Sequence, residues 1–165
     1  MSSGDGIARF WEAARADQSK RKLHPFGFPE GGSPLPPPAW SFGGTPEQAE
    51  ELLDLVLAGV KTATASALWD YEIEGEPLPE VGQLDIVLDG SGRPRALLRT
   101  TDVTVCPFEE VSADHARREG EGDLSLAYWR HVHQDFFTRY TSHGRDFSMQ
   151  MPVVLQTFEV LFTAE

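Results

Sequence analysis

Cysteine, lysine and long apolar runs are scarce in this chain of 165 residues. The single cysteine, Cys106, excludes an internal disulfide and a metal cage of several thiolates. The apolar runs are too short to span a bilayer, and no hydrophobic signal segment follows Met1. We therefore expect a cytoplasmic protein with no membrane partner.

Metal ligands are also sparse. His131 and His133 are two residues apart on a predicted helix, so they should face different directions, and no Asp-x-Asp cluster is present. The sequence thus predicts no metal site and requires no cofactor. It is compatible with a catalytic divalent ion that arrives with the phosphate of a substrate.

Positive charge is in short supply. The chain has 14 Lys and Arg against 26 Asp and Glu, a net charge of -12. Proteins that bind duplex nucleic acid present a broad basic surface, because neutralised phosphates supply most of the affinity. We therefore exclude duplex DNA and expect a small nucleoside or a short, accessible RNA segment. Two local arginine clusters could each bind one or two phosphates: Arg93, Arg95 and Arg99, and Arg117 and Arg118.

Lys61 is the only lysine after Lys22, whereas the chain has eleven arginines. A partly buried lysine can lose its proton and act as a base or nucleophile, which arginine cannot do. A lysine just beyond a helix also binds the terminal carbonyl groups and interacts favourably with the helix dipole. Spacing alone favours this second, structural role.

The amino-terminal part differs in composition from the rest. Residues 7–22 have the apolar spacing of a helix, and residues 23–38 are rich in proline and glycine, as in a semi-rigid connector. We divide the chain into an amino-terminal helix and arm, residues 1–39, and a compact domain, residues 40–165. The helix either packs back on that domain or forms an oligomer contact, as in a homodimer.

The compact domain mixes helices and strands. Thr45-Pro46-Glu47-Gln48 is a capping box that starts an amphipathic helix, and Gly59 ends it. Further helices are expected at 112–119 and 124–140, the latter with a buried stripe. Strands are expected at 60–66, 84–88, 95–105 and 153–162, with 153–162 central. The stripe consists of Leu126, Trp129, Val132, Phe136 and Tyr140. The pattern predicts an α+β fold, a small β-barrel with helices packed on its outside.

Several segments in order resemble the ASCH domain, a relative of the PUA domains of RNA-modifying proteins. They include "WSFGGTPEQAEELLDLV", "LAGVKTATAS", "VSADHARREGEGD" and "GRDFSMQMPVVLQTFEVLF", and the resemblance runs from about Trp40 to Phe162. It is nearest to the small bacterial ASCH proteins described as ribonucleases. The family implies a PUA-like β-barrel with a cleft lined by the lysine segment.

The resemblance implies two activities. One ASCH group resembles an amidohydrolase of acetylcytidine, which implies catalytic roles for Lys61, Thr64 and Glu119. Thr64 would be the nucleophile, Lys61 its base and Glu119 the group that holds the lysine. The other group is described as a ribonuclease, which implies Lys61 with Ser148 and Tyr71. Of the two, cleavage of single-stranded RNA is favoured on overall resemblance, and a non-catalytic RNA-binding module is the third hypothesis.

Other residues near the lysine segment are candidates for substrate binding. Trp40, Phe42 and Trp69 could stack on a base, and Ser66 and Tyr71 are further candidates for substrate binding. A role in the core is the stronger expectation for the Trp40 and Phe42 pair. In a straight strand Lys61 and Thr64 would point to opposite faces, since their separation is odd. A catalytic pair therefore requires the chain to bend between them.

Overall fold

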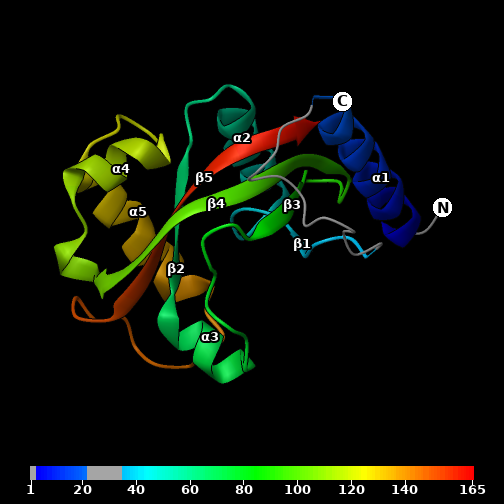
Figure 1. Ribbon diagram of the computed structural model, residues 1–165. Helices are drawn as coiled ribbons and strands as arrows, with labels where there is room; N and C mark the ends of the chain where they lie inside the picture. Colours follow the sequence, from blue (N-terminus) through cyan, green and yellow to red (C-terminus); the bar gives the residue numbers. More distant parts are fainter. Residues whose placement is uncertain (1–2, 22–34) are drawn as a thin grey trace. The chain divides into compact units, whose positions relative to one another are not determined.

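The computed structural model describes residues 3–21 and 35–165. The described residues form two compact units: residues 3–21, 35–57, 82–99 and 159–165 belong to the first, and residues 58–81 and 100–158 to the second (Figure 1). Each unit has its own hydrophobic core.

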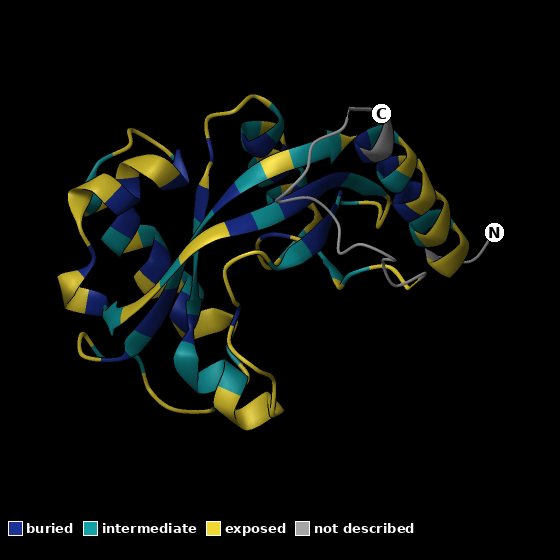
Figure 2. Cartoon of the chain, viewed as in Figure 1, coloured by how far each residue is buried: buried dark blue, intermediate teal, exposed yellow. Residues whose placement is uncertain are grey.

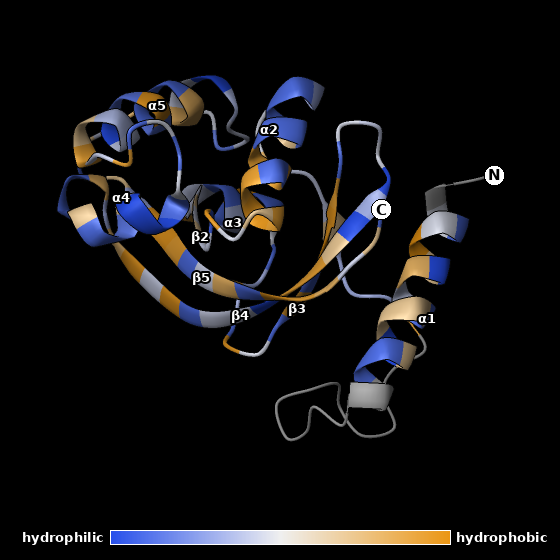
Figure 3. Ribbon diagram, turned by 90° about the horizontal axis from the view of Figure 1, so that it is seen from above, coloured by the Kyte–Doolittle hydropathy of each residue, from blue (hydrophilic) through white to orange (hydrophobic). Residues whose placement is uncertain are grey.

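The first unit contains α1 (Ser3–Arg21), whose apolar side faces a strand pair. Phe10, Trp11 and Ala14 are buried in one cluster with Ile86 and Leu97. Figures 2 and 3 show the buried, hydrophobic side of α1 opposite an exposed, hydrophilic side. The predicted amino-terminal helix is confirmed, and it packs on strands. Most of the predicted connector lies outside the described residues, and the boundary at residues 39–40 stays a prediction.

Helix α2 (Pro46–Leu57) also belongs to the first unit, and its capping box is confirmed. The Thr45 hydroxyl accepts a hydrogen bond from the Gln48 amide at 3.1 Å. The apolar spacing buries Ala49, Leu53 and Val56, and α2 contacts β3. The sequence of this helix thus encodes both its start and its buried face.

The strands expected at 84–88 and 95–105 are confirmed as β3 (Leu84–Leu88) and β4 (Pro94–Pro107). Strand β3 and the first half of β4 form the hairpin of the first unit. The Asp89 carboxylate accepts backbone hydrogen bonds from Ser91 at 2.8 Å and Arg93 at 3.0 Å, which holds the turn. A short strand that was not predicted, β1 (Ala39–Trp40), pairs in parallel with β3.

The second unit carries the lysine segment. It contains β2 (Ala63–Ala67), α3 (Leu68–Glu74), the 3-10 turn η1 (Phe108–Glu110), α4 (Ala113–Glu119) and α5 (Leu126–Arg139). Helices α4 and α5 lie side by side, and α4 contacts β2 (Figure 1). Its core includes Phe108, Trp129 and Phe137. Ser112 and Ser125 cap α4 and α5, so the predicted positions of these helices are confirmed.

The buried stripe of α5 differs from the prediction. Trp129, His133 and Phe137 are buried, whereas Phe136 is half-buried and Tyr140 is exposed. The observed stripe has four-residue spacing and includes a histidine, because His133 has polar partners in the interior. Apolar pattern alone could not select it.

The five strands form one sheet in the order β1-β3-β4-β5-β2. The long β5 (Pro152–Thr163) lies between β4 and β2, as predicted for an interior strand. Within the described residues the sheet is open, with β1 and β2 at its edges, so the α+β class is confirmed and the closed β-barrel is wrong. The apolar strand faces pack against helices, which removes the need for closure. No helix in residues 3–21 and 35–165 combines the length and apolar character needed to cross a membrane.

Candidate functional site around Lys61

Lys61 is placed by backbone contacts between the chain before β2 and the end of α4. The Thr62 amide donates to the Arg118 carbonyl at 2.8 Å. Gly120 then ends α4 with a φ of 72°, in the left-handed region that favours glycine. A Cβ at this position would meet the Val60 carbonyl oxygen at 2.5 Å. Lys61 precedes Thr62 and Glu119 follows Arg118, so the hydrogen bond between Thr62 and Arg118 brings Lys61 and Glu119 together.

The Lys61 amine is buried, with 2% of the residue exposed. Its Nζ donates to the Glu119 carbonyl at 3.4 Å, to Glu119 Oε1 at 3.3 Å and to Glu121 Oε2 at 3.1 Å. The carbonyl contact is the helix-capping interaction considered for this lysine, although the capped helix is α4. The two carboxylate contacts form a buried ion-pair group, an arrangement that structural capping does not require.

Glu119 is the centre of this group. Its Oε1 lies 3.3 Å from both Lys61 Nζ and His133 Nε2. Its Oε2 lies 2.7 Å from His115 Nε2 and accepts from Trp129 Nε1 at 2.5 Å. Only 1% of Glu119 is exposed, and its four partners offset the free-energy cost of burying the carboxylate.

The titration of the group follows from this geometry. Burial opposes the charged form of Glu119, but Lys61, His133 and the His115 contact outweigh it and hold the pKa well below 4.5. Burial also opposes the charged form of His133, yet Glu119 and Glu121 outweigh it and raise the pKa above 6.5. The His133 Nδ1 donates to the Trp129 carbonyl at 2.9 Å, which fixes the ring. The two shifts favour a protonated His133 beside an ionised Glu119.

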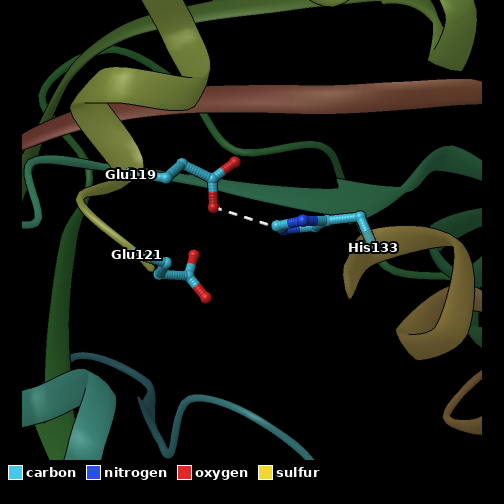
Figure 4. A group of neighbouring side chains, drawn as sticks. All are labelled: Glu119, Glu121 and His133. Carbon is cyan, nitrogen blue, oxygen red and sulfur yellow. Dashed lines mark ion pairs between the residues drawn. The ribbon is translucent and has the colours of Figure 1, made fainter. Parts of the chain in front are cut away.

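Glu119, Glu121 and His133 point toward one another from α4, the loop after it and α5 (Figure 4). One donor atom from each lies within 4.8 Å of the others, so these residues could hold a metal ion. Carboxylate and imidazole are suitable ligands for Zn²⁺. However, the Lys61 ammonium already contacts both carboxylates, so an ion would compete with it.

The sequence profile of the ASCH domain matches residues 38–162. This chain belongs to the ASCH domain family. Similar solved structures include protein EF3133 from Enterococcus faecalis, with 36% identity, a TM-score of 0.78 and coverage of 94% of this chain and 88% of that chain. An ASCH domain from Lactobacillus crispatus has 31% identity, a TM-score of 0.76 and 94% coverage of each chain. The comparison with curated proteins found no match.

Within this ASCH domain, Thr64 lies in β2 opposite Gln156 of β5. Burial alternates along the segment: Lys61 and Ala63 are buried, while Thr62 is exposed and Thr64 is half-buried. The alternation is that of an extended chain, in which Thr64 shares its face with Thr62 and Ser66. The role of Thr64 as nucleophile therefore stays a prediction.

The residues expected for RNA cleavage form other contacts. Ser66 and Tyr71 share a hydrogen bond of 2.8 Å. Ser148 lies in the turn before β5, where its hydroxyl accepts from the Gln150 amide at 3.2 Å. Trp69 is half-buried, and the Arg145 guanidinium lies 4.7 Å from its ring. Tyr71 and Ser148 thus have structural partners, and their catalytic roles stay predictions.

Trp40 and Phe42 belong to the first unit. Their rings meet edge to face with centroids 4.8 Å apart, and the Trp40 indole donates to Asp85 at 3.0 Å. Phe42 is buried. These contacts agree with the expected core role, and stacking of a base on either ring stays a prediction.

The arginine clusters are paired with carboxylates. Arg93 and Arg95 contact Asp89, and Arg99 contacts Glu159. Arg117 and Arg118 both contact Asp114. Each cluster is thereby partly neutralised, which lowers its attraction for phosphate.

Sequence reasoning missed Glu121, His133, His115 and Trp129 as members of the site. His115, four residues before Glu119 on α4, was a readable signal, since residues at this spacing share a helix face. Likewise, Trp129 and His133 are four residues apart on α5. Nothing in the sequence showed that these two faces meet.

Proposed function

We propose that this ASCH domain is a hydrolase that removes the acyl group from a small acylated nucleoside such as acetylcytidine. The observation that supports this best is the buried Lys61 ammonium, held by Glu119 at 3.3 Å and Glu121 at 3.1 Å. ASCH membership supports a hydrolase-like or RNA-binding role in general. The specific substrate is the one that the resemblance to the acetylcytidine amidohydrolases implies, and the chemistry of this amine supports the reaction.

Attack on an amide carbonyl places negative charge on its oxygen. A fixed cation in surroundings of low polarity stabilises that charge strongly, because little solvent must reorganise around it. Lys61 is buried and fixed by three oxygen acceptors. In this proposal its ammonium binds the developing oxyanion, and Glu119 holds the ammonium in place. The contacts with two carboxylates favour this role over that of base.

The negative charge of the protein favours a small substrate over a long RNA. The whole chain has a net charge of -12, and the most exposed member of the ion-pair group is the Glu121 carboxylate. This negative charge would repel the phosphodiester backbone of a long RNA, whereas a nucleoside carries no phosphate. This reverses the order of the two hydrolase activities expected from the overall resemblance.

Cleavage of single-stranded RNA is the second candidate. It is supported by the half-buried Trp69 with Arg145 over its ring, since aromatic and guanidinium planes stack on unpaired bases. Lys61 would then stabilise the charge on phosphorus-bound oxygen. The third hypothesis is a domain that binds RNA without cleaving it.

The test is an assay of purified protein with acetylcytidine and, separately, with short single-stranded RNA. We expect release of acetate from acetylcytidine, and a loss of about a hundredfold or more in kcat for Lys61→Ala, as for an oxyanion donor. Cleavage of RNA alone, with the same dependence on Lys61, would favour the second candidate. Binding without turnover of either substrate would support the binding module.

A further inference from the structure

We infer that Glu121 is a catalytic carboxylate of this site: the substrate carbonyl replaces it on Lys61, and the released carboxylate transfers a proton from the attacking water to the leaving nitrogen. The inference rests on the proposed amide hydrolysis. It names a residue that neither the spacing of the lysine segment nor the ASCH resemblance indicated.

Glu119 is unsuited to proton transfer. Both of its oxygens are engaged, Oε1 by Lys61 and His133 and Oε2 by His115 and Trp129. With 1% of the residue exposed, a substrate has little access to either oxygen. Its role is to hold the ammonium.

Glu121 has the access that Glu119 lacks. Its side chain is 15% exposed, against 2% for Lys61, and its Oε2 accepts from the Lys61 amine at 3.1 Å. It is therefore the most exposed of the two carboxylates and the ammonium that form the ion-pair group. A substrate that approaches the amine from solvent meets Glu121 before Glu119.

The backbone on both sides of Glu121 is fixed. Gly120 and Gly122 have φ values of 72° and 57°, in the left-handed region. A Cβ on Gly120 would meet the Val60 carbonyl oxygen, and one on Gly122 would overlap the Tyr128 ring. The loop thus holds the Glu121 backbone closely, and the carboxylate can leave Lys61 by rotation of its side chain.

One acceptor of the ammonium is exchangeable. An ammonium has three N–H donors, and three oxygens lie at 3.1 to 3.4 Å from Nζ. The Glu119 carbonyl belongs to the last residue of α4, and Glu119 Oε1 also contacts His133. Glu121 Oε2 belongs to the more exposed of the two side chains that contact the amine, so the substrate carbonyl oxygen can reach its place most readily. The replacement of Glu121 also frees a carboxylate beside the reacting carbon.

In the proposed hydrolysis, the proton that leaves the water ends on the leaving nitrogen. In this inference water is the nucleophile, in place of the Thr64 hydroxyl that the resemblance implies. Glu121 accepts a proton from water as the water oxygen bonds to the acyl carbon, and Lys61 stabilises the oxyanion. The protonated Glu121 gives that proton to the amide nitrogen as the carbon–nitrogen bond breaks. The products are the amine and the carboxylic acid, and Glu121 is again a carboxylate. Transfer by a positioned carboxylate contributes about a hundredfold to ten-thousandfold.

The test is the kinetics of acetylcytidine deacylation by the full chain with Glu121→Gln and Glu121→Ala. We expect kcat to fall about a hundredfold or more in both variants, with KM changed only a few-fold. Added formate should restore part of the rate in Glu121→Ala, because it supplies a carboxylate in the vacated space. Glu76→Gln, which alters an exposed glutamate in the same unit, should leave kcat unchanged.

Three results would overturn the inference, and they differ. If the wild-type protein and Glu121→Gln turn over equally fast while Lys61→Ala is inactive, Glu121 has no role in proton transfer and the proposed function stands. If the wild-type protein releases no acetate, the proposed function fails and the inference fails with it. A loss of kcat without formate rescue, accompanied by loss of the folded near-ultraviolet circular dichroism signal, would assign Glu121 a structural role and contradict the inference.

Discussion

Glu119 is a glutamate in the interior of the second unit, with a cation or an N–H donor at each oxygen. Removal of one member of a buried ion pair leaves its partner uncompensated, which typically costs about 3–5 kcal/mol. We expect Glu119→Gln to lower the free energy of unfolding by that order, measured in urea. Glu76→Gln is the exposed control, and equal stability of the two variants would contradict this account.

The pH dependence of stability follows from two pKa shifts in the same group. The pKa of Glu119 is held below 4.5 in the folded protein, so its share of stability is present above 4.5 and is lost as the pH falls toward the folded pKa. The pKa of His133 is raised above 6.5, so its share is present below 6.5 and is lost as the pH rises through the folded pKa. Stability should therefore be highest between these limits.

His133→Gln isolates the alkaline side of this profile. The variant has no imidazole to titrate, so its free energy of unfolding should fall less from pH 6.5 upward than that of the wild-type protein. Urea denaturation across the pH range measures both profiles. Identical slopes above pH 6.5 would show that His133 does not stabilise the fold through its charge.

We expect the activity to be independent of a metal ion. Because the Lys61 ammonium occupies the carboxylate pair, we expect EDTA treatment to leave deacylation unchanged. In Lys61→Met the competing charge is gone, so Glu119, Glu121 and His133 should bind Zn²⁺ more tightly than in the wild-type protein. Isothermal titration calorimetry measures the difference. Loss of activity in EDTA, restored by metal, would contradict this role of Lys61.

At the level of elements, the end of α4 positions the site. Gly75 and Gly120 end helices of equal length with φ values of 68° and 72°, but only Gly120 has a backbone oxygen in the space of a Cβ. Gly75→Ala should cost about 1 kcal/mol or slightly more, for the left-handed backbone alone. Gly120→Ala should cost clearly more in urea denaturation and should also reduce activity. Equal costs would contradict the close packing of this loop.

Local signals predicted most of the elements. The capping box at Thr45 lies within four consecutive residues and forms as expected. The Ser112 cap and the Asp89 turn are equally local, since each depends on contacts within a few residues. The short β1 and α3 were missed because neither has a readable cap or a sustained apolar period. The α5 stripe was misplaced because the burial of His133 depends on Glu119, which is distant in sequence.

At the level of the whole molecule, the main error was the prediction of a closed β-barrel, since the sheet is open within the described residues. Alternating apolar residues are required of any strand that packs against something, whether the partner is another strand of a barrel or a helix. The strand pattern therefore predicted the α+β class and left closure undetermined. The site was predictable only through Lys61 and Glu119, and their meeting depends on the long-range pairing of Thr62 with Arg118.

The most direct test of the account is the rate of acetate release from acetylcytidine by wild-type protein, Lys61→Arg and Lys61→Ala, measured side by side. We predict turnover by the wild-type protein and a loss of about a hundredfold or more in Lys61→Ala. Lys61→Arg should retain part of the rate if it folds, because a guanidinium can also stabilise an oxyanion. Wild-type activity that Lys61→Ala fully retains would contradict the central role of the buried amine.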